Sequence, residues 1–171
     1  MIKKVLILFL FFQLGFAQKA ILDSINDSYY QKYEFPLLKK LDLQNLKITS
    51  EDFYFRFSFI GTKIDFWKDS LNQNNGFITK FIYKSKRNVV VDTIVKKYVL
   101  NAKQSQKLET LIESSNLDSI PDDSKIAKWR FGCNGITYRI EKATKKTYNA
   151  KTYLAPKSQD STLFEIKNIN A

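Results

Sequence analysis

The clearest pattern in the chain is an alternation of apolar and polar positions over residues 53–59. Phenylalanine takes every second position of this segment, and Tyr54, Arg56 and Ser58 take the positions between. Successive side chains of a strand point to opposite faces, so this period of two predicts a strand with one aromatic face.

Five further segments have strand-forming composition and are bounded by turn residues. The Asn-Gly pair at 75–76 suits positive φ, and the basic run at 85–88 joins two strands as a hairpin tip. The predicted strands are residues 53–59, 63–71, 77–83, 89–100, 136–142 and 147–154.

Helix signals stand between and after these strands. Asn101 is a good N-cap for a helix of about fifteen residues, which Pro121 prevents from continuing. Pro156 introduces a last predicted helix over residues 158–169, and a short helix interrupted before Pro36 is expected earlier. The order predicts an α+β fold, an antiparallel sheet of about six strands with helices packed on one face.

Two parts of the chain resemble each other. Residues 76–81 and 135–140 each begin with glycine and lead through a basic turn into a return strand, and residues 100–106 resemble 154–159 ahead of a helix. The alternatives are a duplicated strand–strand–helix unit and a coincidence of strand-forming composition.

The first seventeen residues predict a secretory signal peptide. Lys3 and Lys4 precede an uninterrupted apolar run over 5–12, and Gly15 and Ala17 provide the small residues of a cleavage site. The apolar run is shorter than the roughly 20 residues that a membrane-spanning helix needs. We therefore expect cleavage after Ala17 and export to the periplasm or the medium.

Composition predicts a single folded domain after the signal peptide. The chain is 44% hydrophobic and 15% aromatic with only five glycines, which is unlike a disordered sequence. Residues 18–50 are the least regular and predict a helical lead-in segment, while residues 51–171 form the α+β domain.

The formal net charge of +11 bears on partners more than on fold. An exported protein meets little nucleic acid, so an acidic protein, a glycan or an anionic lipid surface is the better expectation. The alternative is that lysine is simply abundant, since the charges are spread along the chain.

Several classes of chemistry are excluded by missing residues. The sequence has no histidine, which removes Ser-His-Asp catalysis and His-ligated zinc, and it has no Gly-rich phosphate loop. Cys133 is the single cysteine, so no disulfide forms within the chain; a buried inert thiol and a reactive one remain alternatives. No catalytic residue, metal site or cofactor is predicted.

Carboxylates are the chemistry that remains. Asp65 and Asp69 lie four apart in a predicted strand, roughly 13 Å along it, which is too far for a glycosidase pair. Glu109 and Glu113 share a helix face whose ordinary explanation is solvated surface. The aspartates at 118, 122 and 123 are interpreted as a solvated turn in preference to a calcium loop.

The most distinctive local segment is residues 128–135, where Trp129 and Arg130 precede a glycine-bounded turn. Tryptophan and arginine are enriched at binding hot spots, whereas the alternative places Trp129 in the core. The predicted contact residues are Trp129, Arg130, Arg56, Lys86 and Arg87.

The C-terminal third resembles small exported bacterial proteins of unknown function. The resemblance is carried by Trp129, by the Gly-Ile-Thr-Tyr-Arg-Ile-Glu run at 135–141, by Tyr-Leu-Ala-Pro at 153–156 and by Gln-Asp-Ser at 159–161. It implies export and an α+β domain, and it implies no reaction.

Three functions follow as hypotheses. The preferred one is an exported, non-enzymatic domain that binds a protein, glycan or other envelope component. A carboxylate-based hydrolase or transferase acting on cell-wall glycans requires a pocket with two acids at catalytic separation. A binder of anionic lipid or lipopolysaccharide requires the basic tips at 86–87 and 145–146 to lie on one side.

Overall fold

The computed structural model describes residues 30–87, 89–130 and 135–162. The chain divides into two compact units, Met1–Asn45 and Leu46–Ala171. The predicted signal peptide, residues 18–29 of the lead-in segment and Cys133 lie outside the described residues, so the predictions for them stay predictions.

The first unit is helical over residues 30–40. A π-helical turn, η1 (Tyr30–Glu34), runs directly into α2 (Phe35–Lys40), with Pro36 in the first turn of α2. The predicted interruption before Pro36 is wrong in this respect: a proline in the first turn removes an N–H that has no partner within the helix anyway. The phenol of Tyr30 donates a 2.6 Å hydrogen bond to Asn45.

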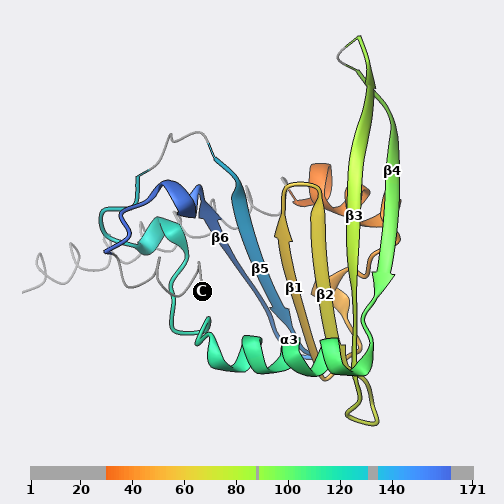
Figure 1. The fold of residues 1–171 in the computed structure, drawn as a ribbon, viewed down its shortest axis with the longest axis vertical. Helices are drawn as coiled ribbons and strands as arrows, with labels where there is room; N and C mark the ends of the chain where they lie inside the picture. The colour runs from red at the N-terminus through yellow and green to blue at the C-terminus, as the bar shows by residue number, and fades with distance from the viewer. Residues whose placement is uncertain (1–29, 88, 131–134, 163–171) are drawn as a thin grey trace, which may run out of the picture. The chain divides into compact units, whose positions relative to one another are not determined.

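The second unit is a six-stranded antiparallel sheet, which confirms the predicted α+β fold (Figure 1). The strand order across the sheet is β4-β3-β2-β1-β5-β6. Its strands are β1 (Phe53–Phe59), β2 (Thr62–Lys68), β3 (Asn74–Lys86), β4 (Val89–Val99), β5 (Thr137–Ala143) and β6 (Tyr148–Leu154).

The alternation in β1 sorts the sheet into two different faces. Phe55 of β1 stands opposite Phe66 of β2, and both belong to the main core with Ile140 of β5. The other face carries Tyr54 and Arg56, whose strand neighbours include buried charged residues. One face is therefore apolar and the other holds a polar network.

Helix α3 (Ala102–Ser114) covers the apolar face (Figure 1). Its N-cap is the predicted Asn101, which accepts from the Gln104 backbone N–H while the Gln104 side chain accepts from the Asn101 N–H. Leu108 and Ile112 pack into the core cluster of Phe55 and Phe66. Packing of a helix on one face of the sheet is thus confirmed for α3.

The predicted last helix is not formed at its start. Pro156–Ser158 is a short 3-10 turn, η4, and residues 159–162 are not helical. Ala155 before it takes the left-handed conformation with φ 47°. The predicted helix is therefore wrong over residues 159–162. Residues 163–171 lie outside the described part, so the rest of the helix and the duplicated unit stay predictions.

The bounds of two strands, β2 and β3, differ from the predicted ones by up to three residues. β2 ends at Lys68 because Asp69 accepts 2.9 Å hydrogen bonds from the backbone of Leu71 and Gln73 and turns the chain. β3 begins at Asn74 and continues to Lys86, beyond the predicted range 77–83. The longer β3 makes the β3–β4 hairpin longer than predicted.

Candidate functional site

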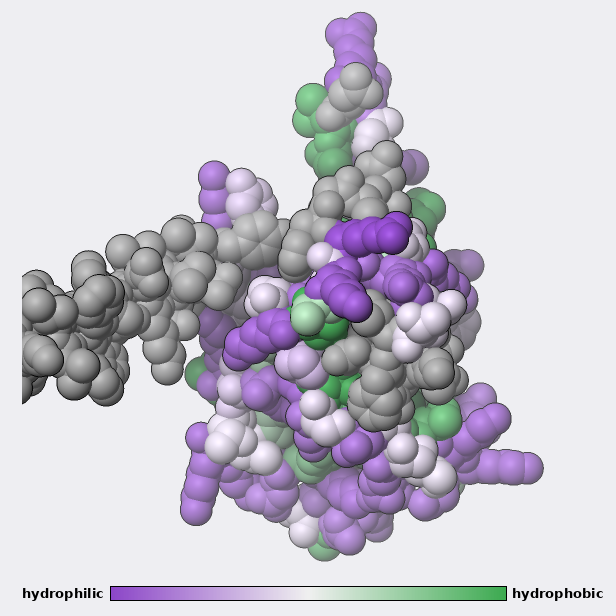
Figure 2. Space-filling view, turned by 90° about the vertical axis from the view of Figure 1, so that its left-hand side faces the viewer, coloured by the Kyte–Doolittle hydropathy of each residue, from purple (hydrophilic) through white to green (hydrophobic). Residues whose placement is uncertain are grey.

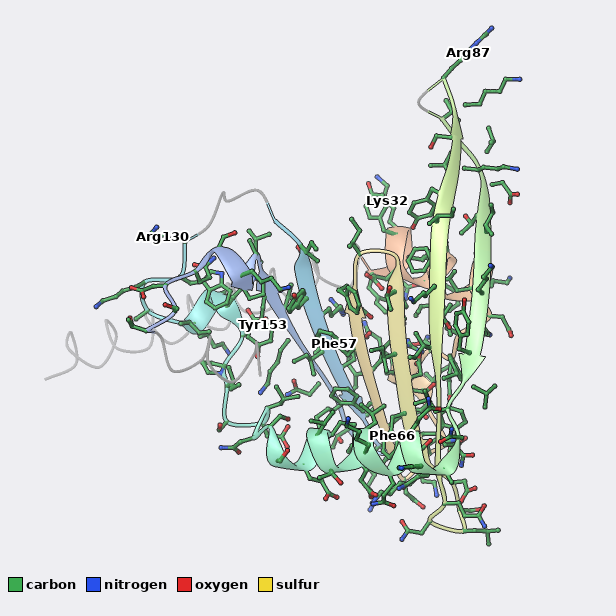
Figure 3. All side chains as sticks on the ribbon, viewed as in Figure 1. Lys32, Phe57, Phe66, Arg87, Arg130 and Tyr153 are labelled. Carbon is green, nitrogen blue, oxygen red and sulfur yellow. The ribbon has the colours of Figure 1, made fainter. Side chains whose placement is uncertain are left out.

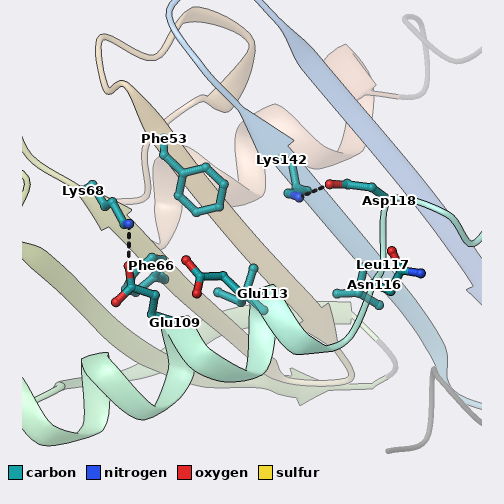
Figure 4. A pocket seen from close by; sticks show the side chains of 10 residues that line it. Phe53, Phe66, Lys68, Glu109, Glu113, Asn116, Leu117, Asp118 and Lys142 are labelled. Atoms are coloured by element: carbon teal, nitrogen blue, oxygen red, sulfur yellow. Dashed lines mark hydrogen bonds and ion pairs between the residues drawn. The ribbon is translucent and has the colours of Figure 1, made fainter.

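A pocket of about 360 Å³ opens between α3 and the ends of β1, β2 and β5 (Figure 4). Its floor is apolar and its rim carries charged and amide side chains. The lining residues are Phe53, Phe66, Lys68, Glu109, Ile112, Glu113, Asn116, Leu117, Asp118 and Lys142.

Both lysines at the rim already have carboxylate partners. Lys68 of β2 pairs with Glu109 of α3, and Lys142 of β5 pairs with Asp118 at 2.6 Å. Glu109 also accepts a 2.6 Å hydrogen bond from the amide of Asn74. These donors hold the pKa of Glu109 below its usual range, with the Lys68 hydrogen bond as the largest cause.

The chain after α3 is fixed by a lysine of the edge strand β6. Lys151 of β6 donates to the backbone carbonyls of Leu117 at 2.7 Å, Asp118 at 3.0 Å and Ile120 at 2.6 Å. Burial lowers the pKa of Lys151. These contacts position Leu117 and Asp118 at the pocket.

Glu113 is the acidic side chain at the pocket that has no partner among the described residues. It follows Glu109 by one helical turn, and its carboxylate extends from α3 over the pocket (Figure 4). With both lysines neutralised by other acids, the lining keeps one uncompensated negative charge.

Glu109 does not have the raised pKa that the general acid of a glycan hydrolase needs. Its pKa lies below the usual range, so its carboxyl is held ionised. Burial raises the pKa of Asp65 and of Asp123, but neither residue lines the pocket. Glu109 therefore does not support the hydrolase hypothesis.

The second surface feature is the outer part of the β3–β4 hairpin, residues 81–87 and 89–95, which we call the β3–β4 arm. β2 pairs with β3 only as far as Thr62 opposite Lys80, and Gly61 accepts one further hydrogen bond from Phe81 N–H at 2.8 Å. Beyond this point β3 pairs with β4 alone, to Lys86 opposite Val89. The arm projects past the rest of the sheet as a two-stranded ribbon (Figure 1).

The arm carries large apolar side chains that face solvent. Their exposed fractions run from 42% for Ile94 to 64% for Ile82. Figure 2 shows apolar surface on the arm beneath its hydrophilic tip. The exposed apolar residues of the arm are Ile82, Tyr83, Val89, Val90, Val91 and Ile94.

The two edges of the sheet are treated differently. At the β6 edge, the backbone N–H of Thr152 donates to Asp122 at 2.8 Å and that of Leu154 donates to Asp123 at 2.7 Å. The predicted solvated turn thus closes a sheet edge. β4, by contrast, has β3 as its one neighbour among the described strands, so no described strand pairs with its outer edge.

Arg56, a predicted contact residue, is a buried side chain. Its Nε donates a 2.6 Å hydrogen bond to Asp65, to which the phenol of Tyr54 also donates at 3.0 Å, and both ions are 0% exposed. Glu141 stands opposite Arg56 on β5 and accepts a 2.7 Å hydrogen bond from Tyr148. Arg56 is therefore off the exposed surface, because its strand position turns it toward two carboxylates.

Trp129 is also buried, while its neighbour is not. The indole N–H donates to the carbonyl of Leu154 at 3.1 Å, and the ring packs against Tyr153. The backbone of Arg130 exchanges hydrogen bonds with the Gln159 side chain, which leaves the guanidinium at the surface. The core alternative considered for Trp129 matches this position.

Lys86 and Arg87 are exposed at the tip of the arm, where Arg87 takes a left-handed φ of 50°. Figure 3 shows Arg87 at the end of the arm and Arg130 on the other side of the sheet, beyond β6. Of the five predicted contact residues, Lys86 and Arg87 lie together, Arg130 lies apart, and Arg56 and Trp129 are inside.

The two basic tips lie at opposite ends of the sheet. The arm extends from the β1–β2 turn end, since Lys80 pairs with Thr62, whereas the turn at 144–147 lies at the start of β1, where Tyr54 pairs with Ala143. The lipid hypothesis required them on one side, so this geometry does not favour it.

Sequence reasoning missed both the pocket and the exposure of the arm. Glu113 lies on an exposed helix face, as predicted, but the spacing of the carboxylates gives no sign of the pocket that it borders. The valine-rich residues 89–91 lie in a strand, as predicted, but their exposure is not predicted. The run Val89-Val90-Val91 lacks the alternation of a strand with one buried face, which was the available signal.

Comparisons with protein families, curated proteins and solved structures find no match to this chain. The resemblance of the C-terminal third to exported bacterial proteins stays a prediction. None of the helices in the described ranges combines the length and apolar character that crossing a membrane requires.

Proposed function

We propose that this protein is an exported, non-enzymatic binding module that captures a partner protein through the β3–β4 arm. The observation that carries the proposal is an open edge strand with solvent-facing apolar side chains at the end of a folded sheet. An extended segment of the partner adds to β4 as a further strand, and its side chains meet the apolar residues of the arm.

The charge of the arm selects the partner. The arm is net positive: its basic residues include Lys84, Lys86 and Arg87, whereas Asp92 is an acidic one. Two more lysines follow at the base of the arm, at positions 96 and 97. A second copy would bring like charges together, which costs free energy. An acidic, partly apolar segment of another protein fits this edge better.

The arm would also gain more stability from a bound partner than the central strands would. A two-stranded ribbon is marginally stable in water, and large exposed apolar patches usually mark interaction surfaces. A third strand would satisfy backbone groups of β4 and shield Ile82 and Ile94 from water.

The test uses synthetic peptides of about six residues, a typical strand length, that alternate valine with glutamate or valine with lysine. We expect the glutamate peptide to shift the backbone amide signals of β4 and slow their hydrogen exchange. The lysine peptide and a glutamate peptide N-methylated at alternate residues should bind much more weakly, because charge or backbone pairing is removed.

A double variant, Ile82→Ser with Ile94→Ser, should weaken binding of the glutamate peptide at least tenfold, because it removes apolar contact without changing the charge of the arm. Leu71→Ser changes an apolar residue in the β2–β3 turn that is more exposed than either isoleucine, and it is the matched control. Equal binding of both peptides, signal changes away from β4, or a chain that dimerises through the arm would each contradict the proposal.

A further inference from the structure

We infer that the pocket beneath α3 is a second binding site, for a small organic cation with an apolar body. This inference is independent of the arm and of its partner. It rests on the residual charge of the pocket, its aromatic floor and its size.

The charge of the pocket decides the sign of the ligand. An anion would have to displace Glu109 from Lys68 or Asp118 from Lys142, and both pairs are in direct contact. A cation would instead meet Glu113, which has no partner among the described residues. Neutralising this carboxylate requires no existing ion pair to break.

The floor of the pocket accommodates both a cation and an apolar group. Phe53 and Phe66 pack edge to face with 6.1 Å between ring centroids. The ammonium of Lys142 already lies over the Phe53 ring at 5.8 Å, which is the geometry of a cation–π contact. Ile112 and Leu117 complete an apolar surface for the ligand body.

The volume sets the scale of the ligand. About 360 Å³ lies near the lower end of the range for pockets that hold small molecules. An arylalkylamine fits these limits: its ring packs on Phe53 and Phe66, and its ammonium donates to Glu113. The exposed rim at Asn116 leaves room for a polar substituent.

Three probes of similar shape test the inference: 2-phenylethylammonium, 2-phenylethanol and 3-phenylpropanoate. We expect the ammonium to bind saturably in the millimolar range or tighter, with amide shifts at Phe53, Glu113 and Leu117 in NMR titrations. The alcohol should bind several-fold more weakly, and the carboxylate more weakly still.

Glu113→Gln keeps the shape of the side chain and removes its charge. The ammonium should then bind about fivefold more weakly, as expected for loss of one exposed ion pair, while the alcohol is unaffected. Asp92→Asn removes an exposed acid on the arm and should change neither affinity. Thermal unfolding of each variant checks that the fold is retained.

The inference fails if the ammonium shows no saturable binding, if it binds no better than the alcohol, or if Glu113→Gln leaves its affinity unchanged. Such a failure does not affect the proposal for the β3–β4 arm, because the peptide assay measures signals of β4 and the amine assay measures signals of α3 and β1. The two proposals can therefore fail separately.

Discussion

Arg56 was predicted to be a surface contact residue, and the structure places its side chain inside the protein. The side chain lies in the middle strand of three, between Asp65 on β2 and Glu141 on β5, with no exposed area. Burial raises the pKa of Asp65 and Arg56 opposes that effect, while burial and the Asp65 charge raise the pKa of Tyr54. An isolated charge at this depth is costly, so removing only one of Arg56 and Asp65 should destabilise the fold more than replacing both.

We predict that Arg56→Met destabilises the protein by about 3–5 kcal/mol, because it leaves Asp65 buried without its counter-ion. Adding Asp65→Leu to this variant should recover much of the loss, since Asp65 is then no longer a buried ion without its partner, while Glu141 keeps Arg139 at 3.7 Å. The measurement is the free energy of unfolding in urea for both single variants and the double variant.

The matched control is an exposed ion pair in the same unit. Lys145 contacts Asp52 at 2.9 Å with both side chains more than half exposed, so Lys145→Met should change stability far less. Equal losses for Arg56→Met and Lys145→Met, or strictly additive losses in the Arg56/Asp65 cycle, would show that the buried pair is not coupled as described.

At the scale of elements, α3 is tied to the sheet by core packing and by polar contacts of Glu109. Glu109 binds Lys68 of β2 and Asn74 of β3, at the wall of the pocket. The pKa of Glu109 is lowered in the folded state from 4.5. Its contribution to stability is thus present above the unfolded pKa and is lost as pH falls through the folded pKa.

We predict that the stability of the protein falls on acidification partly through Glu109. Glu109→Gln should be less stable than the parent near neutral pH, and the difference should shrink toward zero between about pH 5 and pH 3. Urea unfolding at a series of pH values measures it.

Glu113→Gln is the control on the same helix, since Glu113 makes no ion pair among the described residues and does not tie α3 to the sheet. Its loss of stability near neutral pH should be smaller than that of Glu109→Gln. A loss for Glu109→Gln that does not change with pH would mean that the Lys68 contact does not contribute.

At the scale of the whole molecule, the open β4 edge is useful only where a partner is present and aggregation is controlled. Lysines and arginine at the tip are typical of exposed edges that avoid pairing with copies of themselves. The closed β6 edge limits strand addition to one side. Export, which the first seventeen residues predict, decides which partners are available.

We predict that the protein isolated from the cell that makes it begins at Gln18, because Gly15 and Ala17 fit a signal-peptidase site. Ala17→Phe should block this cleavage, since a bulky side chain does not fit the small-residue position. Intact-mass measurement of the natural protein and the variant decides it. A natural chain that keeps Met1 in the soluble cell interior would contradict export.

The sequence by itself determined the features that depend on near neighbours. The alternation over 53–59 placed β1 at its observed bounds, and Asn101 marked the start of α3 through a capping contact within four residues. The six antiparallel strands also followed, because turns and short connections constrain consecutive strands to pair.

Only the tertiary structure decided what is buried and what is open. Arg56 meets Glu141, and Glu113 reaches the pocket beside Phe53, across long stretches of sequence. The arm is exposed because β2 stops pairing at Thr62 while β3 continues. Burial and pocket shape depend on contacts between distant segments, and no local period along the chain encodes them.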